Sequence, residues 1–378
     1  MQEISLDKTI SKKIQLSSRW FSTIILLSFA LLTKLLTYFA SRNSYLVERL
    51  YSSTIYPYIG KSMGFISSFV PFSIAELFLI GATISLVMGL ILTVFKPRIL
   101  LKNIPKIFHY IIRFFAIAYI LFYFLWGFNY YREDYSLLAN MNMEPATYGE
   151  LRELTLEKIH KANIIRETLL EDINGIFFLE DSIHDLSVLA NMGFSDYQVG
   201  GLNLGGNYGR AKPIFLSKYM SYTGIIGIYI PFTSEANINT DIPHSSILTT
   251  LSHEIAHQRG FAKEDEANFI AYKANINHPD ERFQYSSHYF AMNQLLNEVY
   301  RQNKDDYSLL YQEISHAVRR DLDYSRDYWA LRQGKVREKA TSMNDNYLKA
   351  NNQSQGVKSY SGVVNLLLAE YKDNLINK

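Results

Sequence analysis

The sequence of 378 residues contains no cysteine, and its formal net charge is only +2. Without cysteine, the chain cannot form a disulfide, a thiolate metal site, an iron–sulfur cluster or a cysteine nucleophile, so a bound metal must use His, Asp or Glu. The small net charge argues against a nucleic-acid-binding protein, which normally carries a large basic excess. Hydrophobic residues make up 48% of the chain, which excludes wholesale disorder.

Three long apolar stretches lie in the first third of the chain. They cover about residues 20–40, 72–95 and 108–128, and a helix of about 20 residues crosses the roughly 30 Å hydrocarbon core of a bilayer. The first stretch is too long for a cleaved signal peptide, and no small-residue cleavage site follows it. We therefore predict a multi-pass α-helical membrane region, residues 1–131, whose partner is the lipid bilayer. Lys34 and Glu76 within it are interpreted as structural charges.

Basic residues set the expected orientation of the membrane region. They gather before residue 20 and again in residues 96–106, whereas the loop 41–71 has fewer of them for its length. The positive-inside rule therefore places the N-terminus and the second loop in the cytoplasm. Three crossings then place the chain after about Arg132 outside the cytoplasm, so we expect a multi-pass plasma-membrane protein with an extracytoplasmic C-terminal domain.

The remainder is expected to be α+β and mainly helical, with a small sheet. We predict a helical linking subdomain in residues 132–211 and a second domain in residues 212–378. The pair Thr147 and Glu150 forms a capping box that predicts a helix over 147–171. Apolar runs at 213–216 and 225–232 predict strands. The five glycines of GGLNLGGNYG lack the ending of a phosphate loop, so we interpret this segment as a flexible loop or flap.

The residues that carry chemistry gather in a predicted helix, 244–258, with the sequence HSSILTTLSHEIAHQ. His253 and His257 are four residues apart, so their imidazoles lie on one helix face. With Glu254 they form the HExxH pattern, in which two neutral imidazoles bind one Zn²⁺ ion and the glutamate is the base toward water activated by that ion. The alternative is two solvent-facing histidines on a surface helix, and the motif's position in a capped amphipathic helix disfavours it.

A catalytic zinc ion needs a third protein ligand. Gly260 is expected to end the helix, and a second helix begins with KEDEANFIAYKA. Glu264 and Asn268 share a face of that helix with Ala267 and Ala271, which allow close packing. We therefore predict Glu264 as the third ligand, with Glu266 as the fallback, and Asn268 as a partner that supports the ligands.

These motifs resemble those of known peptidases. HExxH followed by Glu264-x-x-Ala267-Asn268 looks like a gluzincin-type zincin metallopeptidase, and the second element is similar to that of the CaaX-processing membrane proteases. The resemblance implies that Glu264 binds zinc and that Asn268 supports a histidine. Lys263 stands where metzincins carry their third histidine, which excludes that family. The whole layout resembles an uncharacterised bacterial family of membrane proteins with a zincin-like C-terminal domain.

Two further features are expected near the metal. Zincins place an edge strand beside it to pair with an extended peptide, and residues 225–232 are in the right place, with Glu235 and Asn237 as candidate polar contacts in the cleft. An ordinary half-buried strand is the alternative. A donor must also stabilise the developing oxyanion, and we select Tyr360, with His288 as second choice.

The sequence therefore predicts a membrane-anchored zinc metallopeptidase that hydrolyses peptide bonds in an extracytoplasmic domain. The partners would be lipid and a peptide or protein substrate, and no nucleic acid. Two alternatives remain open. One is a non-catalytic membrane sensor or binding protein with a zincin-like ectodomain, and the other is a silent fold in which zinc only braces two helices.

Overall fold

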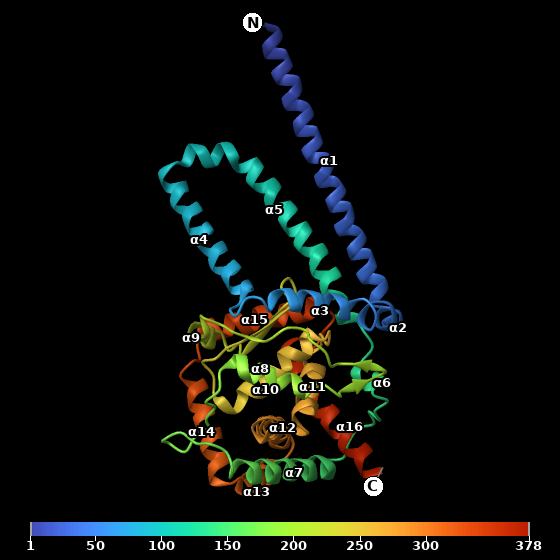
Figure 1. Cartoon of the computed structure of the whole chain (residues 1–378), viewed down its shortest axis with the longest axis vertical. Helices are drawn as coiled ribbons and strands as arrows, with labels where there is room; N and C mark the ends of the chain where they lie inside the picture. Colours follow the sequence, from blue (N-terminus) through green and yellow to red (C-terminus); the bar gives the residue numbers. More distant parts are fainter. Residues whose placement is uncertain (1, 377–378) are drawn as a thin grey trace.

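The computed structural model describes the backbone of residues 2–376 and the side chains of residues 20–98 and 101–376. It confirms the predicted fold class. Three long apolar helices come first, and a mainly helical domain with two small sheets follows. In Figure 1 the helices rise as two arms from one face of the domain: one is α1, and the other is the hairpin of α4 and α5. The basic side chains before residue 20, which enter the orientation argument, lie outside the described side chains.

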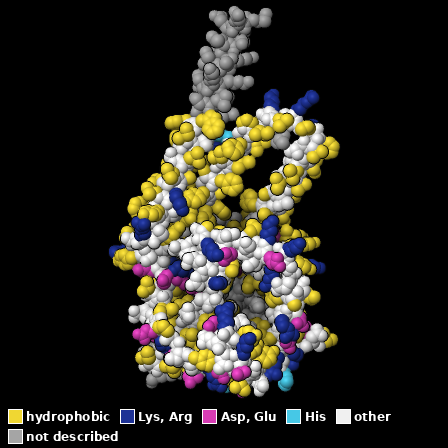
Figure 2. Space-filling view, turned by 180° about the vertical axis from the view of Figure 1, so that it is seen from behind, with side chains coloured by type: hydrophobic (Ala, Val, Ile, Leu, Met, Phe, Trp, Pro, Cys, Tyr) yellow, Lys and Arg dark blue, Asp and Glu magenta, His cyan; other side chains and the backbone are white. Residues whose placement is uncertain are grey.

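The membrane region contains three helices long and apolar enough to span a bilayer: Trp20–Ala40, Ile74–Phe95 and Leu101–Leu125. The last of these begins earlier and ends earlier than predicted. Figure 2 shows apolar side chains covering the arms and basic side chains at the tip of the hairpin. The helices of this region are α1 (Gln2–Ala40), α2 (Ser44–Val47), the π-helix η1 (Glu48–Ser52), α3 (Tyr56–Ser67), α4 (Ile74–Phe95) and α5 (Pro97–Leu125).

The short helix α3 connects the first arm to the second and lies across the top of the domain (Figure 1). It buries Tyr56, Gly60 and Gly64 against the domain. A Cβ atom added at Gly64 would stand 1.7 Å from the carbonyl oxygen of Tyr208, so only glycine permits this approach. Tyr208 belongs to the glycine-rich segment that we interpreted as a flexible loop or flap. Residues 204–209 of the segment form neither helix nor strand, but Tyr208 is buried and its carbonyl oxygen accepts a hydrogen bond from Gln258 at 2.6 Å, so this part is packed against the domain.

Helix α4 is fixed to the domain by two carboxylates. Glu235 accepts hydrogen bonds from the backbone N–H groups of Ile74 and Ala75, both at 3.0 Å, and so occupies the positive end of the helix dipole. In return, Glu76 accepts hydrogen bonds from the N–H groups of Phe215 and Leu216, both at 2.8 Å. Glu76 therefore has the structural role that we predicted for it, and it acts by fixing the helix to the domain.

The domain is built around α10, which carries HExxH. Helices α7, α8, α11 and α12 pack with α10 around one hydrophobic core, whose members come from both sides of the boundary predicted at residue 211. The capping box of Thr147 and Glu150 is present at the start of α7. The helices are η2 (Gly127–Tyr131), α6 (Tyr135–Leu138), α7 (Tyr148–Arg166), α8 (Ile183–Met192), α9 (Ser217–Met220), η3 (Ser221–Thr223), α10 (His244–Gln258), α11 (Glu264–Ile276), α12 (Glu281–Gln302), α13 (Lys304–Gln312), α14 (His316–Ala330), α15 (Lys335–Ala350), η4 (Gly356–Gly362) and α16 (Val363–Ile376).

The larger sheet has the strand order β3-β5-β4, with β3 (Lys212–Pro213), β5 (Glu235–Ile238) and β4 (Gly227–Ile230). Strand β4 pairs antiparallel with β5, opposing Tyr229 to Ala236, and its other edge carries no strand among the described residues. A second sheet of two residues per strand joins β1 (Gln198–Val199) and β2 (Leu202–Asn203). The strand predicted at 225–232 is therefore present as an edge strand, and it lies against α10.

Candidate metal centre

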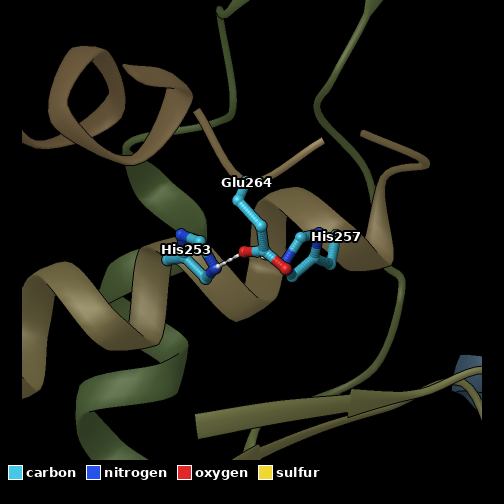
Figure 3. Close-up of side chains that lie close together, drawn as sticks. All are labelled: His253, His257 and Glu264. Atoms are coloured by element: carbon cyan, nitrogen blue, oxygen red, sulfur yellow. Dashed lines mark ion pairs between the residues drawn. The ribbon is translucent and has the colours of Figure 1, made fainter. Parts of the chain in front are cut away.

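Two consecutive helices bring the expected ligands together. Helix α10 has the predicted bounds, Pro243 precedes it, and Gly260 adopts a positive φ of 89° just after it. This left-handed residue turns the chain sharply, as expected from glycine after a helix C-terminus. Helix α11 then begins at Glu264, close to the imidazoles of α10 (Figure 3).

His253, His257 and Glu264 form a buried group that could hold a metal ion. One potential ligand atom from each residue lies within 4.8 Å of the other two. The Oε2 atom of Glu264 lies 3.2 Å from Nε2 of His253 and 3.4 Å from Nε2 of His257. The two rings are nearly perpendicular, with centroids 4.6 Å apart. Figure 3 shows the carboxylate of Glu264 directed between the two imidazoles. The arrangement resembles an HExxH...E zinc motif.

The hydrogen bonds around the group leave its inward atoms free for a cation. Nδ1 of His257 lies 2.7 Å from the carbonyl oxygen of Phe261. This contact fixes the ring and makes Nε2 the acceptor nitrogen when the ring is neutral. Oε2 of Glu264 and Oε2 of Glu254 are buried and have no hydrogen-bond partner in the described part of the chain. Buried polar atoms without partners are costly, and a bound ion would satisfy that of Glu264. The donor set of two imidazoles and one carboxylate suits Zn²⁺.

The electrostatics of the group favour positive charge at its centre. Burial alone would raise the pKa of Glu264, but the two histidines hold it well below its usual range. Burial alone would lower the pKa of His257, yet the negative charge of Glu264 raises it to about 9. The carboxylate thus draws a cation to the imidazoles, either protons or a metal ion.

Glu254 points to the strand side of α10. It is 4% exposed, and a Cβ atom added at Gly227 of β4 would stand 2.5 Å from its Oε1 atom. Glu254 therefore lies against the strand, beside the histidines of its own helix. Burial raises the pKa of Glu254 to about 7, although the two histidines act in the opposite direction.

Tyr360 lies on the other side of the group, in η4. Burial raises its pKa well above the usual value, and the negative charge of Glu264, with which its hydroxyl interacts, adds to the effect. Asn344 donates a hydrogen bond to this hydroxyl at 3.3 Å. Asn268 donates to the carbonyl oxygen of Tyr360 at 3.4 Å. The expected hydrogen bond from Asn268 to a histidine is not formed in the described structure. Nδ1 of His253 has no partner there, and Nδ1 of His257 contacts Phe261.

Other residues weighed from the sequence lie elsewhere. Glu266, the fallback ligand, accepts a hydrogen bond from the N–H of Tyr135 and faces Lys263. His288 lines a separate cavity of about 550 Å³. Glu235 does not line the cleft, because it binds the start of α4 and pairs with a lysine. The amide nitrogen of Asn237 donates to backbone carbonyls within the sheet.

Sequence reasoning missed the side chains that anchor the end of α10. Nε1 of Trp126 donates a hydrogen bond to the carbonyl oxygen of His257 at 3.2 Å. The hydroxyl of Tyr56 donates one to the carbonyl oxygen of Gln258 at 2.9 Å. Nη1 of Arg132 donates to the carbonyl oxygen of Gly260 at 3.0 Å. The last carbonyls of a helix lack partners within it, and here residues beside the membrane helices supply them. No local sequence pattern predicts contacts between residues that are more than a hundred positions apart.

Arg132 is itself held by an acidic residue from η1. Its Nε and Nη2 atoms bind the two carboxylate oxygens of Glu48 at 2.9 and 2.8 Å, and both side chains are buried. Such two-point pairing fixes the guanidinium in one orientation. The segment between α1 and α4 is therefore part of the scaffold of the metal group.

Comparison with known proteins assigns the chain to a family but does not assign a function. No curated protein and no solved structure matches it. Residues 51–368, which run from the segment beside the membrane to the end of the domain core, match the family described as "Protein of unknown function (DUF3810)". Because this match covers most of the sequence, the chain belongs to the DUF3810 family, whose function is not established.

Proposed function

We propose that the chain is a membrane-anchored zinc metallopeptidase of the gluzincin type, which hydrolyses peptide bonds in a domain outside the cytoplasm. The observation that carries the proposal is the convergence of four side chains. His253, His257 and Glu264 form the metal group, and Glu254, on the same helix, lies against strand β4. A group that only braced two helices would have no need of a fourth, base-like carboxylate.

The three ligands would hold one Zn²⁺ ion. When bound, zinc supplies Lewis-acid chemistry, because it lowers the pKa of water toward 7 and polarises a carbonyl group. The fit is supported by the donor set and by the buried carboxylate oxygen of Glu264, which has no hydrogen-bond partner among the described residues.

Glu254 is the general base and then the general acid. With a pKa raised to about 7 by burial, it accepts a proton from the attacking water near neutral pH and passes it to the departing amine nitrogen of the peptide. Tyr360 is the donor to the carbonyl oxygen as negative charge develops there. Its hydroxyl remains protonated because burial and Glu264 raise its pKa.

Strand β4 would bind the substrate backbone. Its edge opposite β5 carries no strand among the described residues, Glu254 lies close to Gly227 of this strand, and an extended peptide can add to such an edge through backbone hydrogen bonds. The orientation is supported by the basic residues at the tip of the α4–α5 hairpin (Figure 2), at the opposite end of the helices from the domain. The positive-inside rule places that tip in the cytoplasm.

The test uses the full chain, because residues before 132 anchor α10. Purified protein is assayed for bound zinc and for hydrolysis of a peptide library, together with Glu254→Gln, His257→Ala, Glu264→Gln and Glu266→Gln. We expect Glu254→Gln to keep zinc and lose at least 100-fold in hydrolysis, and His257→Ala to lose both. Glu266→Gln is the matched control and should keep both.

The outcomes separate the alternatives. Zinc in the wild-type protein without hydrolysis, and a biological function unaffected by Glu254→Gln, would favour the sensor or the structural metal site. Loss of zinc in Glu266→Gln but not in Glu264→Gln would show that the third ligand is assigned wrongly.

A further inference from the structure

The segment between α1 and α4 has one face on the domain and one apolar face directed away from it. In α3, Tyr56, Gly60 and Gly64 are buried at a four-residue spacing. On the opposite side, Tyr58 is 75% exposed and Phe65 is 55% exposed. The exposed apolar set of this segment continues before and after the helix and comprises Tyr45, Leu46, Leu50, Ile55, Tyr58, Phe65, Ile66, Phe69 and Phe72.

The place of this surface in the fold indicates what covers it. It is continuous with Trp20–Ala40 on one side and with Ile74–Phe95 on the other, and both helices are apolar enough to span a bilayer. Figure 1 shows α3 lying across the base of the arms. A helix with aromatic side chains on one face, joined to spanning helices at both ends, suits the interface between lipid headgroups and acyl chains.

A second exposed apolar side chain lies beside the start of α4. Phe215 is 88% exposed, and its backbone N–H is bound to Glu76 in the first turn of α4. Its side chain is therefore held beside the point where α4 leaves the domain. The apolar surface of residues 45–72 and the side chain of Phe215, far apart in the sequence, thus adjoin the ends of the membrane helices.

We infer that residues 45–72 and Phe215 lie in the outer interface of the bilayer, and that the metal centre therefore acts on membrane-tethered polypeptides close to the lipid surface. The second half of this inference rests on the proposed peptidase function. The interfacial position rests only on the exposed apolar surface and its continuity with the membrane helices, and its assignment to the outer side rests on the proposed orientation.

The distance from the metal group to the lipid surface follows from the contacts of α3. The hydroxyl of Tyr56 binds the carbonyl oxygen of Gln258, the residue after His257, so the end of α10 lies directly against the domain side of α3. A helix with side chains is about 10–12 Å across, which places the metal group roughly 10–20 Å from the lipid side of α3. An extended chain covers about 3.3 Å per residue. The hydrolysed bond would therefore lie roughly three to six residues from the membrane.

The depth of α3 can be measured without reference to activity. Because the chain has no cysteine, a single introduced cysteine gives one labelling site for an environment-sensitive fluorophore. Phe65→Cys and Tyr58→Cys in full-length protein in vesicles should be quenched strongly by brominated lipids. Ile173→Cys, at a fully exposed position of the domain, is the matched control and should not be quenched. Equal quenching at residues 65, 58 and 173 would overturn the interfacial position.

The substrate class is tested with one peptide sequence presented in two ways. The sequence is one that the purified protein hydrolyses in a library. It is joined to a transmembrane helix through spacers of 2 to 20 residues, or supplied free in solution, with wild-type protein and Glu254→Gln in vesicles. We expect the tethered forms to be hydrolysed at least tenfold faster at equal concentration, with the best spacer near three to six residues.

Equal hydrolysis of tethered and free peptides would overturn the substrate class and leave the peptidase function standing. Hydrolysis of neither form by a zinc-loaded protein would overturn the peptidase function and the substrate class with it, whereas the quenching result would still decide the position of α3.

Discussion

Gly227 of β4 lies in contact with the carboxylate of Glu254. A Cβ atom added at Gly227 would stand 2.5 Å from Oε1 and 2.9 Å from Cδ of that side chain. The backbone of Tyr229, two residues further along the strand, acts to lower the pKa of the same carboxylate. The strand therefore limits the position of Glu254 through a space that only glycine leaves open.

Gly227→Ala should move Glu254 away from the strand. We expect zinc content to remain near the wild-type level, because the three atoms nearest to the added methyl group all belong to Glu254, while hydrolysis falls at least tenfold owing to the misplaced base. Zinc analysis and peptide hydrolysis on the same sample measure both. Gly149→Ala is the control, since an added Cβ there meets only Thr147 at 3.8 Å. Unchanged hydrolysis in Gly227→Ala would contradict the role given to Glu254.

Tyr360→Phe tests the oxyanion donor. Removing one such donor typically lowers kcat by about 100- to 1000-fold, and we expect this loss with little change in KM and zinc content. Tyr347→Phe is the comparison, because Tyr347 also faces the charge of Glu264 but accepts its hydrogen bond from Tyr130. A larger loss of kcat in Tyr347→Phe than in Tyr360→Phe would assign the donor to Tyr347 instead.

Glu48→Gln should destabilise the domain from the membrane side. Removing one partner of a buried ion pair costs about 3–5 kcal/mol, because the other charge remains buried. The Arg132 guanidinium would then hold the carbonyl of Gly260 less well, so we expect a lower thermal midpoint and weaker zinc binding. Arg326→Gln breaks an exposed pair with Asp323 and should cost less than about 1 kcal/mol. Equal midpoints for the two variants would show that the pair of Glu48 and Arg132 is not important for stability.

Because of His288, the folded protein should lose stability as pH falls. Burial, with the nearby charges of Lys158 and Lys161, lowers its pKa from 6.5 to about 3. Below pH 6.5 His288 therefore binds a proton in the unfolded chain, whereas in the folded chain it does so only near pH 3. The folded state consequently loses stability as pH falls. The loss between pH 8 and pH 5 is about 2 kcal/mol.

Thermal midpoints of the wild-type protein, His288→Phe and His160→Phe from pH 8 to pH 5 measure this effect. The decline should be shallower in His288→Phe than in the wild type, whereas replacing the exposed His160 should leave the slope unchanged. Parallel curves for all three proteins would contradict the prediction.

The sequence was sufficient for features that depend on neighbours along the chain. Helix α10 has the predicted bounds because Pro243, the apolar spacing and Gly260 are all local signals. The grouping of Glu264 with the histidines followed from the short turn between two helices, and Glu264 lies in the group whereas Glu266 faces Tyr135. The capping box at Thr147 and the number of spanning helices were predicted for the same reason.

Features that depend on distant partners could not be predicted. Strand β5 was missed because Glu235 and Asn237 are polar and yet fully buried, and their partners lie in α4, in β4 and at Lys212. The glycine-rich segment looked flexible because its packing against α3 spans more than a hundred residues of chain. Likewise, nothing local indicates that Trp126 binds the carbonyl oxygen of His257.

The two carboxylates that fix α4 also constrain how the protein is made. The N–H of Ala75 is bound by Glu235, which the ribosome adds 160 residues later, while Glu76 is held by backbone that is likewise synthesised after the hairpin. A nascent α4 is therefore complete before its final partners exist. The order of synthesis makes the attachment of α4 to the domain a late step, which can be completed only when the residues of the sheet have been added.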